Sequence, residues 1–383
     1  MNRRIFVKNA AVIAAVSVVK PSYGTLVASP SGGSRKGALP EWRGFNLVDF
    51  NTPNPRSDRR YTSEEHLKWM SDWGFDFVRL PVAYPYYLNF DRSKSITPDE
   101  VYKIDEAAVN KIEQLVQTAH KYNLHVSFNL HRAPGYCINA GFNEPYNLWK
   151  DQEAQNAFYY HWNFWAHRFK NISNEKISFD LLNEPSVRED MNDQHSKQSA
   201  IPGFLYREVA RSAAEAIRRE NKDHLVIADG NNVGNDPIPE LADLDIAQSC
   251  RGYFPHAISH YKAPWANKDP DNLPMPKYPG QVGSQYLDRA LLENYYKPWI
   301  DLKNKGVALH CGECGCWNKT PHDVFLAWFG DVIDILSSHK IGFALWEFIG
   351  DFGILNSGRT DVAYEDWHGY KLDRKLLNLI RKK

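Results

Sequence analysis

Short apolar runs alternate with longer amphipathic segments along most of the chain. The amphipathic segments place apolar residues three and four positions apart, as one face of a helix requires, and they span Ile104–Tyr122, Glu153–Lys170, Phe204–Glu220, Gln285–Lys305 and His322–His339. The short runs are typical of buried strands, and they are Arg43–Leu47, Phe75–Leu80, His125–Leu130, Ile177–Leu182, His224–Ala228, Ala257–His260, Val307–His310 and Gly342–Trp346. This alternation predicts an α/β fold, a single (β/α)8 TIM barrel.

One segment, Tyr253–Gly283, interrupts the alternation. It contains many prolines and Trp265, and it shows no regular period. We therefore expect an extended loop beyond the sixth strand. Long loops on such barrels commonly shape the binding site.

The N-terminal residues have the pattern of a targeting signal. The segment Asn2–Lys8 carries paired arginines, and it precedes an apolar run, Ala10–Val19, and a glycine-rich polar stretch, Ser29–Gly37. This pattern predicts an export signal and flexible leader over residues 1–37, followed by a catalytic domain over 38–383. The arginine pair resembles a twin-arginine signal, which implies a bacterial protein exported to the periplasm or the exterior. An ordinary secretory signal is the alternative.

The same N-terminal run is too short for a membrane anchor. A helix that spans a bilayer needs roughly 20 apolar residues, so we expect no integral membrane segment. The chain has 46 basic and 46 acidic residues, and this balance leaves no broad basic surface of the kind that binds nucleic acid. Its 12 Trp and 20 Tyr supply rings that can stack on sugars, although most are expected in the core. The sequence does not define an oligomeric state.

Five cysteines are present: Cys137, Cys250, Cys311, Cys314 and Cys316. An odd number leaves at least one thiol without an intramolecular disulfide partner. The spacing Cys311-x-x-Cys314-x-Cys316 is not accompanied by a second ligand pair, and a structural zinc ion needs four ligands. We therefore predict packing or disulfide pairing for these residues, with no metal and no cofactor.

Polar residues end several of the apolar runs. Arg79 ends the second, His131 the third, Glu184 the fourth and Glu313 the seventh. The C-terminal strand ends carry the reacting groups of a (β/α)8 barrel, so these two glutamates are expected to face one cavity. Glycosidic hydrolysis uses two carboxyl groups, and a separation of about 5 Å between them is typical of retaining enzymes.

The strand-end residues, in chain order, resemble glycoside hydrolase family 5, the large cellulase family. They are Arg79, His131, Asn183-Glu184-Pro185, His260-Tyr261, Glu313 and Trp346. The triplet Asn-Glu-Pro is short, but its place at a strand end and the Gly-Glu pair about 130 residues later must agree in both order and spacing. The resemblance covers nearly the whole chain after the leader, and it implies a retaining β-glycosidase.

The resemblance also implies roles. Glu184 corresponds to the general acid/base and Glu313 to the nucleophile, which Arg79 keeps ionised. The remaining residues are expected to contact the sugar or the two carboxyl groups: Asn183 at the sugar 2-hydroxyl, His131 in the catalytic subsite, His260 and Tyr261 orienting the carboxyl groups, and Trp346 under the sugar ring. The family separates this His and Tyr by one residue, whereas here they are adjacent.

Several readings remain open. A barrel lined by Trp265, Trp317, Trp346 and Tyr86 suits a β-glucan, and a β-mannan is the alternative within the family. A non-catalytic carbohydrate-binding barrel would keep the aromatic residues but could lose either glutamate. A metal-dependent hydrolase on the same barrel would need ligands in addition to His131 and His260. Linkage and endo or exo action depend on loop shape.

Overall fold

A closed barrel of parallel strands forms the centre of the computed structural model, which describes residues 39–54 and 61–381. The strands follow one another around the barrel in the order β1-β12-β11-β8-β7-β4-β3-β2. Their bounds are β1 Arg43–Asn46, β2 Phe77–Ala83, β3 His125–Arg132, β4 Ile177–Asp180, β7 Leu225–Asp229, β8 Ala247–Gly252, β11 Leu309–Cys314 and β12 Gly342–Leu345. The predicted (β/α)8 barrel is confirmed.

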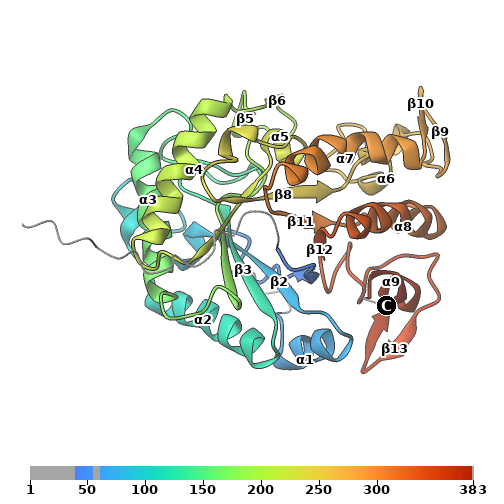
Figure 1. Ribbon diagram of the computed structural model, residues 1–383, viewed down its shortest axis with the longest axis horizontal. Helices are drawn as coiled ribbons and strands as arrows, with labels where there is room; N and C mark the ends of the chain where they lie inside the picture. Colours follow the sequence, from blue (N-terminus) through green and yellow to red (C-terminus); the bar gives the residue numbers. More distant parts are fainter. Residues whose placement is uncertain (1–38, 55–60, 382–383) are drawn as a thin grey trace, which may run out of the picture. The chain divides into compact units, whose positions relative to one another are not determined.

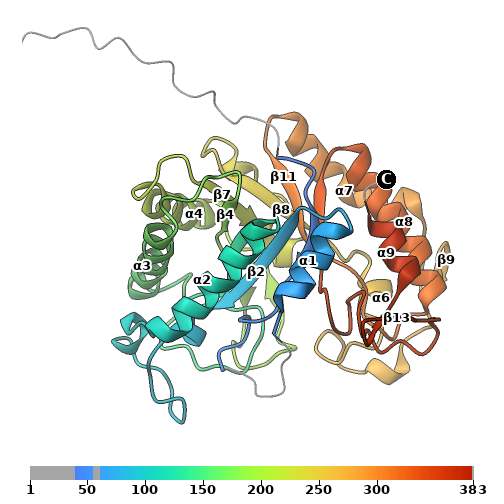
Figure 2. The same cartoon turned by 90° about the horizontal axis from the view of Figure 1, so that it is seen from below.

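Helices connect the strands and lie outside them (Figures 1 and 2). Helix α2 shows why: Val109, Ile112 and Val116 on one face are buried, and the Asp105 side chain accepts hydrogen bonds from the first-turn N–H groups. The helices are α1 Glu64–Asp72, α2 Glu106–Lys121, α3 Gln152–Arg168, α4 Gly203–Arg218, α5 Asn231–Gly234, α6 His256–Ser259, α7 Arg289–Asn304, α8 His322–Ser338 and α9 Arg374–Ile380.

Short elements decorate the loops. Three two-stranded ribbons pair β5 Val187–Arg188 with β6 Gln198–Ser199, β9 Gly280–Val282 with β10 Gln285–Leu287, and β13 Glu365–Trp367 with β14 Tyr370–Leu372. The 3-10 turns are η1 Tyr84–Tyr87, η2 Glu100–Tyr102, η3 Pro239–Leu241 and η4 Pro270–Asn272. The β5–β6 ribbon follows barrel strand β4, so it lies at the C-terminal end of the barrel strands.

The prediction of the sixth barrel strand was wrong. Strand β8 occupies that place, whereas the predicted segment Ala257–His260 falls largely in the short helix α6. Strand β8 carries polar residues that are nevertheless buried. The Gln248 side chain, for example, accepts from the Ile238 N–H at 2.9 Å and donates to the Ile238 carbonyl at 2.7 Å. Hydrogen bonds to a neighbouring loop allow such polar side chains to be buried. Strand β8 therefore has no apolar run by which the sequence could reveal it.

The short connection before β8 also contributes to the wrong prediction of the sixth strand. Between β7 and β8 the chain forms α5 and η3 but no long helix, so the sixth strand arrives earlier than a regular strand–helix spacing predicts. The segment Tyr253–Gly283 then follows β8, and it holds only α6, η4 and β9 among irregular backbone. The expected long loop is therefore present, directly after the true sixth strand.

Aromatic rings fill the barrel at the N-terminal ends of its strands. Trp42 stacks on His125 with ring centroids 3.8 Å apart, and Phe77 lies 4.6 Å from His310. Burial lowers the pKa of both histidines to about 3, so they are neutral at ordinary pH and pack as apolar rings. The buried charged residues Asp180, Asp229 and Arg251 lie instead at or next to the C-terminal ends of their strands.

The predicted leader, residues 1–37, lies outside the described residues. Within the described ranges no helix is both long and apolar enough to cross a membrane.

Candidate active site

One cavity at the C-terminal end of the barrel contains both predicted glutamates. It has a volume of about 580 Å³, and its lining includes Glu184 and Glu313. Of the other predicted residues, His131, His260 and Trp346 also line it. The structure therefore brings together residues from strand ends and loops that are far apart in the sequence.

Glu184 follows strand β4 in a turned backbone conformation. Its φ of 49° lies in the left-handed region, which residues other than glycine seldom adopt. Two hydrogen bonds hold this conformation: the Glu184 N–H donates to Asp229 Oδ2 at 3.0 Å, and the Tyr136 hydroxyl donates to the Glu184 carbonyl at 2.6 Å. The backbone from which the Glu184 side chain extends is therefore held in place on both sides.

Glu313 lies in β11 beside a register shift. The pairing of β11 with β8 is regular up to Cys311 and shifts before Glu313, as in a β-bulge, and bulges commonly redirect a side chain. Gly312 occupies the shift. A Cβ there would lie 2.5 Å from Ser249 Oγ, so a larger residue would displace this hydroxyl, which accepts the Gly312 N–H at 3.2 Å.

Two donors hold the Glu313 carboxylate. Arg79 Nη1 donates to Oε1 at 2.5 Å, and the Tyr253 hydroxyl donates to Oε2 at 3.2 Å. Arg79 is itself fixed, because its Nε donates to Asp180 Oδ2 at 2.6 Å. All four side chains are buried. The Glu313 carboxylate is thus bound by one cationic donor and one neutral donor, and the cationic contact is of the stronger, charge-assisted kind.

A second buried arginine, Arg251 at the end of β8, uses all of its donors. Its Nε donates to Glu184 Oε1 at 3.1 Å, and its two terminal nitrogens bind the Asp229 carboxylate. Nη1 also donates to Ser249 Oγ at 3.1 Å, and Nη2 to Asn183 Oδ1 at 2.9 Å. A guanidinium has five N–H groups, and each finds an acceptor here.

Asn183 is oriented by both arginines. Its Oδ1 accepts from Arg79 Nη2 and from Arg251 Nη2, each at 2.9 Å. Since arginine only donates, these contacts assign the oxygen of the Asn183 amide to this side and the amide nitrogen to the other. The nitrogen is thus a donor for another group.

The two glutamates differ in their electrostatic surroundings. Burial raises the pKa of Glu184 to about 7, and the charge of Glu313 acts in the same direction, while Arg251 opposes them. Burial also raises the pKa of Asp180 to about 7. By contrast, burial is outweighed at Asp229, where Arg251 and Arg79 lower the pKa. A carboxyl group with a raised pKa beside a second carboxyl group is an arrangement that paired catalytic carboxyl groups use.

The prediction that Tyr261 orients the carboxyl groups is wrong in register. Tyr253 makes the contact to Glu313, and Tyr261 is not part of the cavity lining. His260 does line the cavity, with its ring edge-on to Tyr253 at 5.0 Å. The spacing that the resemblance implies occurs at Arg251-Gly252-Tyr253, with an arginine in place of the histidine.

Sequence reasoning missed three functional candidates here: Asp229, Arg251 and Tyr253. Asp229 ends an apolar run, and that signal was available. Strand β8 offered no comparable signal, because Gln248, Ser249 and Arg251 interrupt any apolar run in it.

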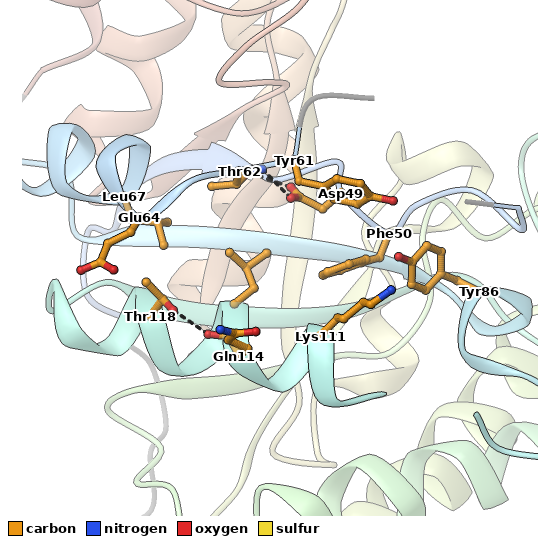
Figure 3. A pocket seen from close by; sticks show the side chains of 11 residues that line it. Asp49, Phe50, Tyr61, Thr62, Glu64, Leu67, Tyr86, Lys111, Gln114 and Thr118 are labelled. Atoms are coloured by element: carbon orange, nitrogen blue, oxygen red, sulfur yellow. Dashed lines mark hydrogen bonds between the residues drawn. The ribbon is translucent and has the colours of Figure 1, made fainter. Parts of the chain in front are cut away.

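The aromatic residues divide between regions. Trp346 stacks on His131 with ring centroids 5.5 Å apart, and Trp265 also lines the cavity. Trp317 packs against Trp265 at 4.6 Å but does not line it. Tyr86 lines a separate cavity of about 480 Å³ beside α1 and α2, where Asp49 and Thr62 are hydrogen-bonded to each other on one wall (Figure 3). The prediction that Tyr86 lines the substrate site was therefore wrong.

All five cysteines are buried free thiols. Burial raises the pKa of Cys311, and that of Cys316 as well. Cys314 follows Glu313 and points its thiol at the Ala344 carbonyl, 3.3 Å away. No group of three or more potential metal ligands occurs among residues 39–54 and 61–381. Packing, one of the two predicted uses of these cysteines, is what the described residues show.

A (β/α)8 barrel with paired glutamates in one cavity is the arrangement of a glycosidase. The chain belongs to the cellulase family, glycosyl hydrolase family 5, whose sequence model matches residues 34–351. It is thus a glycoside hydrolase that acts on O-glycosyl bonds, in a family that retains the anomeric configuration.

Named relatives agree with this membership. The chain is 27% identical to Endoglucanase C of Acetivibrio thermocellus over 365 residues, which are 89% of this chain and 97% of that protein. It is 27% identical to Cellodextrinase A of Ruminococcus flavefaciens over 304 residues, or 78% of this chain and 83% of the relative. A crystal structure of a glycoside hydrolase is 36% identical, with a TM-score of 0.79 over 89% of this chain and 98% of the other.

Proposed function

We propose that this protein hydrolyses β-glucan chains by double displacement, with Glu184 as general acid/base and Glu313 as nucleophile. One observation carries the proposal: the largely buried Glu184 carboxyl group, with a pKa of about 7, shares a cavity with the Glu313 carboxylate, which is bound by an arginine and a tyrosine. At neutral pH the first can donate a proton while the second attacks.

The reaction has two steps. Glu184 donates its proton to the glycosidic oxygen, the bond to the leaving sugar breaks, and a Glu313 oxygen forms an ester with the anomeric carbon. Glu184, now a carboxylate, then removes a proton from water, whose oxygen attacks the same carbon and releases Glu313. Each step inverts the carbon, so the product retains the β configuration.

Neighbouring residues support these steps. The Asn183 amide nitrogen, opposite the arginines, is the donor for the sugar 2-hydroxyl, and Trp346 with His131 forms the aromatic surface beside the reacting sugar. Arg79 and Tyr253 stabilise Glu313 as the ester breaks.

The names of the relatives favour β-glucan as substrate. A β-mannan is the second candidate, because mannose differs from glucose at the 2-hydroxyl, the group that Asn183 would contact. Hydrolysis of cellotetraose and mannotetraose, followed by proton NMR, decides between them and should show the β-anomer first. An α-anomer as first product would refute double displacement.

Glu313→Gln separates catalysis from mere binding. It keeps the side-chain shape but removes the nucleophile, so turnover should fall to near zero while near-ultraviolet circular dichroism is unchanged. Glu293→Gln is the matched control, since Glu293 is exposed on α7 and, among the residues that the structure describes, its ion pair is with Arg289, away from the cavity. Normal turnover in Glu313→Gln would support the non-catalytic alternative.

Export through a twin-arginine signal is part of the same proposal, supported by the Asn2–Lys8 segment. Replacing Arg3 and Arg4 with lysine should retain the protein in the cytoplasm of a bacterial host. Unchanged export of that variant would instead favour an ordinary secretory signal.

A further inference from the structure

Arg251 contacts both glutamates of the site. Its Nε lies 3.1 Å from Glu184 Oε1, and its Nη2 lies 3.5 Å from Glu313 Oε1. Arg79 also contacts Glu313, and its Nη2 lies 3.5 Å from Asp229 Oδ2. Its hydrogen bonds to other residues go to Asp180, Asn46 and Asn183 and not to Glu184. Arg251 is therefore placed between the two groups that exchange charge.

Asp229 holds this cation in place. The carboxylate of Asp229 binds both terminal nitrogens of Arg251, with Nη1 to Oδ1 at 2.9 Å, and both side chains are almost completely buried. The same carboxylate accepts the Glu184 N–H at 3.0 Å. Asp229 thus fixes the cation and the backbone of the acid/base together.

Double displacement moves a negative charge across this site. When the glycosyl-enzyme ester forms, Glu313 loses its charge and Glu184, having given up its proton, gains one. A cation that already contacts both carboxyl groups can stabilise either state without moving, which is how preorganised sites lower barriers. This consequence rests on the function proposed above.

We propose that Arg251 is a positioning residue that serves as the shared counter-ion of Glu184 and Glu313. We further propose that Asp229, by neutralising Arg251, limits how strongly this cation draws Glu184 toward its ionised form. Without Asp229, the acid would lose its proton too readily to protonate a leaving sugar at neutral pH.

The groups around Glu184 set the direction of the effect. Burial raises its pKa most, Glu313 from β11 and Asp229 from β7 raise it further, and Arg251 from β8 lowers it. The other titratable groups that line the same cavity would be unchanged in every variant below; they are His131, His195, Tyr253, His256, His260 and Lys268. Loss of the Asp229 charge should therefore lower the pKa of Glu184.

Asp229→Asn tests this inference with little change in shape, because the amide oxygen can still accept the Glu184 N–H. The basic limb of kcat/KM against pH, measured on an unactivated oligosaccharide, should move down by about one pH unit. Tyr206→Phe is the control: it removes the 2.7 Å hydrogen bond to the Asp229 carbonyl without changing any charge, and it should leave the limb in place.

Two double variants show whether Asp229 acts through Arg251. Asp229→Asn with Arg251→Gln removes the cation as well, so the limb should return to the wild-type position or above it. Asp229→Asn with Arg251→Lys keeps a cation, so the limb should stay low. A limb that does not move in Asp229→Asn, or that is equally low with glutamine and lysine, would overturn the proposal.

A measurement without turnover separates this inference from the proposed function. Carboxyl absorption of the unliganded protein, titrated by difference infrared spectroscopy, reports the pKa of Glu184 once its band is assigned by its loss in Glu184→Gln. We expect the pKa of Glu184 to be lower in Asp229→Asn and in its Arg251→Lys double variant, and to be restored in the Arg251→Gln double variant. If these pKa changes of Glu184 appear in a protein that does not hydrolyse β-glucan, the proposed substrate is wrong and the counter-ion role of Arg251 stands. If the changes are absent in an enzyme that does hydrolyse β-glucan, the proposed function stands and the counter-ion role is refuted.

Discussion

Glu184 should destabilise the folded protein at neutral pH, so that Glu184→Gln increases its stability. In the native state the pKa of Glu184 is raised from 4.5 to about 7, first by burial and then by the charge of Glu313. In the unfolded chain neither cause acts. At 1.36 kcal/mol per pH unit, this difference amounts to ~3 kcal/mol.

The sign and the pH window follow from the two pKa values. Below pH 4.5 the carboxyl group is protonated in both states and costs no stability. Between pH 4.5 and about 7 the unfolded state ionises while the folded state does not, so wild-type stability falls relative to the variant. Above about pH 7 the difference is constant. Glutamine carries no charge at any pH, and its Oε1 can still accept from Arg251 Nε.

Guanidinium unfolding at pH 4, 5.5 and 8 measures this effect. Glu184→Gln should match the wild type at pH 4 and exceed it by ~3 kcal/mol at pH 8. For a chain of this size, a gain of that order corresponds to roughly 4 °C in Tm. The exposed variant Glu293→Gln should show no such pH-dependent gain. A gain that is equal at pH 4 and pH 8, or a loss at pH 8, would refute the reasoning.

Two further predictions concern the roles of individual residues. Glu184→Ala should lower turnover of unactivated glycosides by about 100-fold or more, while azide should partly restore turnover of dinitrophenyl glycosides and give a β-glycosyl azide; a correctly folded variant without rescue would contradict the acid/base role. Tyr253→Phe should reduce kcat/KM about tenfold or more, because it removes a hydrogen bond to the charged Glu313. Tyr261→Phe should leave it nearly unchanged, and equal effects at the two tyrosines would mean that the contact at Glu313 has no catalytic weight.

The sequence alone determined the barrel and the two glutamates that we propose as its catalytic pair. Strand and helix periodicities are local properties of the chain, and the polar residue that ends an apolar run is visible without its partners. Both Glu184 and Glu313 have this form, with Leu182 and Leu309 in the runs before them. Because the two strand ends belong to one closed barrel, both glutamates are expected to face the same space, and one cavity is lined by both.

Only the tertiary structure located the sixth strand and what it contributes. Gln248 and Arg251 are buried in β8 because acceptors and donors from other elements satisfy them: Ile238 in the preceding loop, Asp229 on β7 and Glu184 after β4. In a sequence these residues have the polarity of a surface loop. Burial of a polar group is stable only when its hydrogen bonds are made, and those partners are distant in the chain, so no local pattern could reveal the strand, the tyrosine that contacts Glu313 or the arginine between the two glutamates.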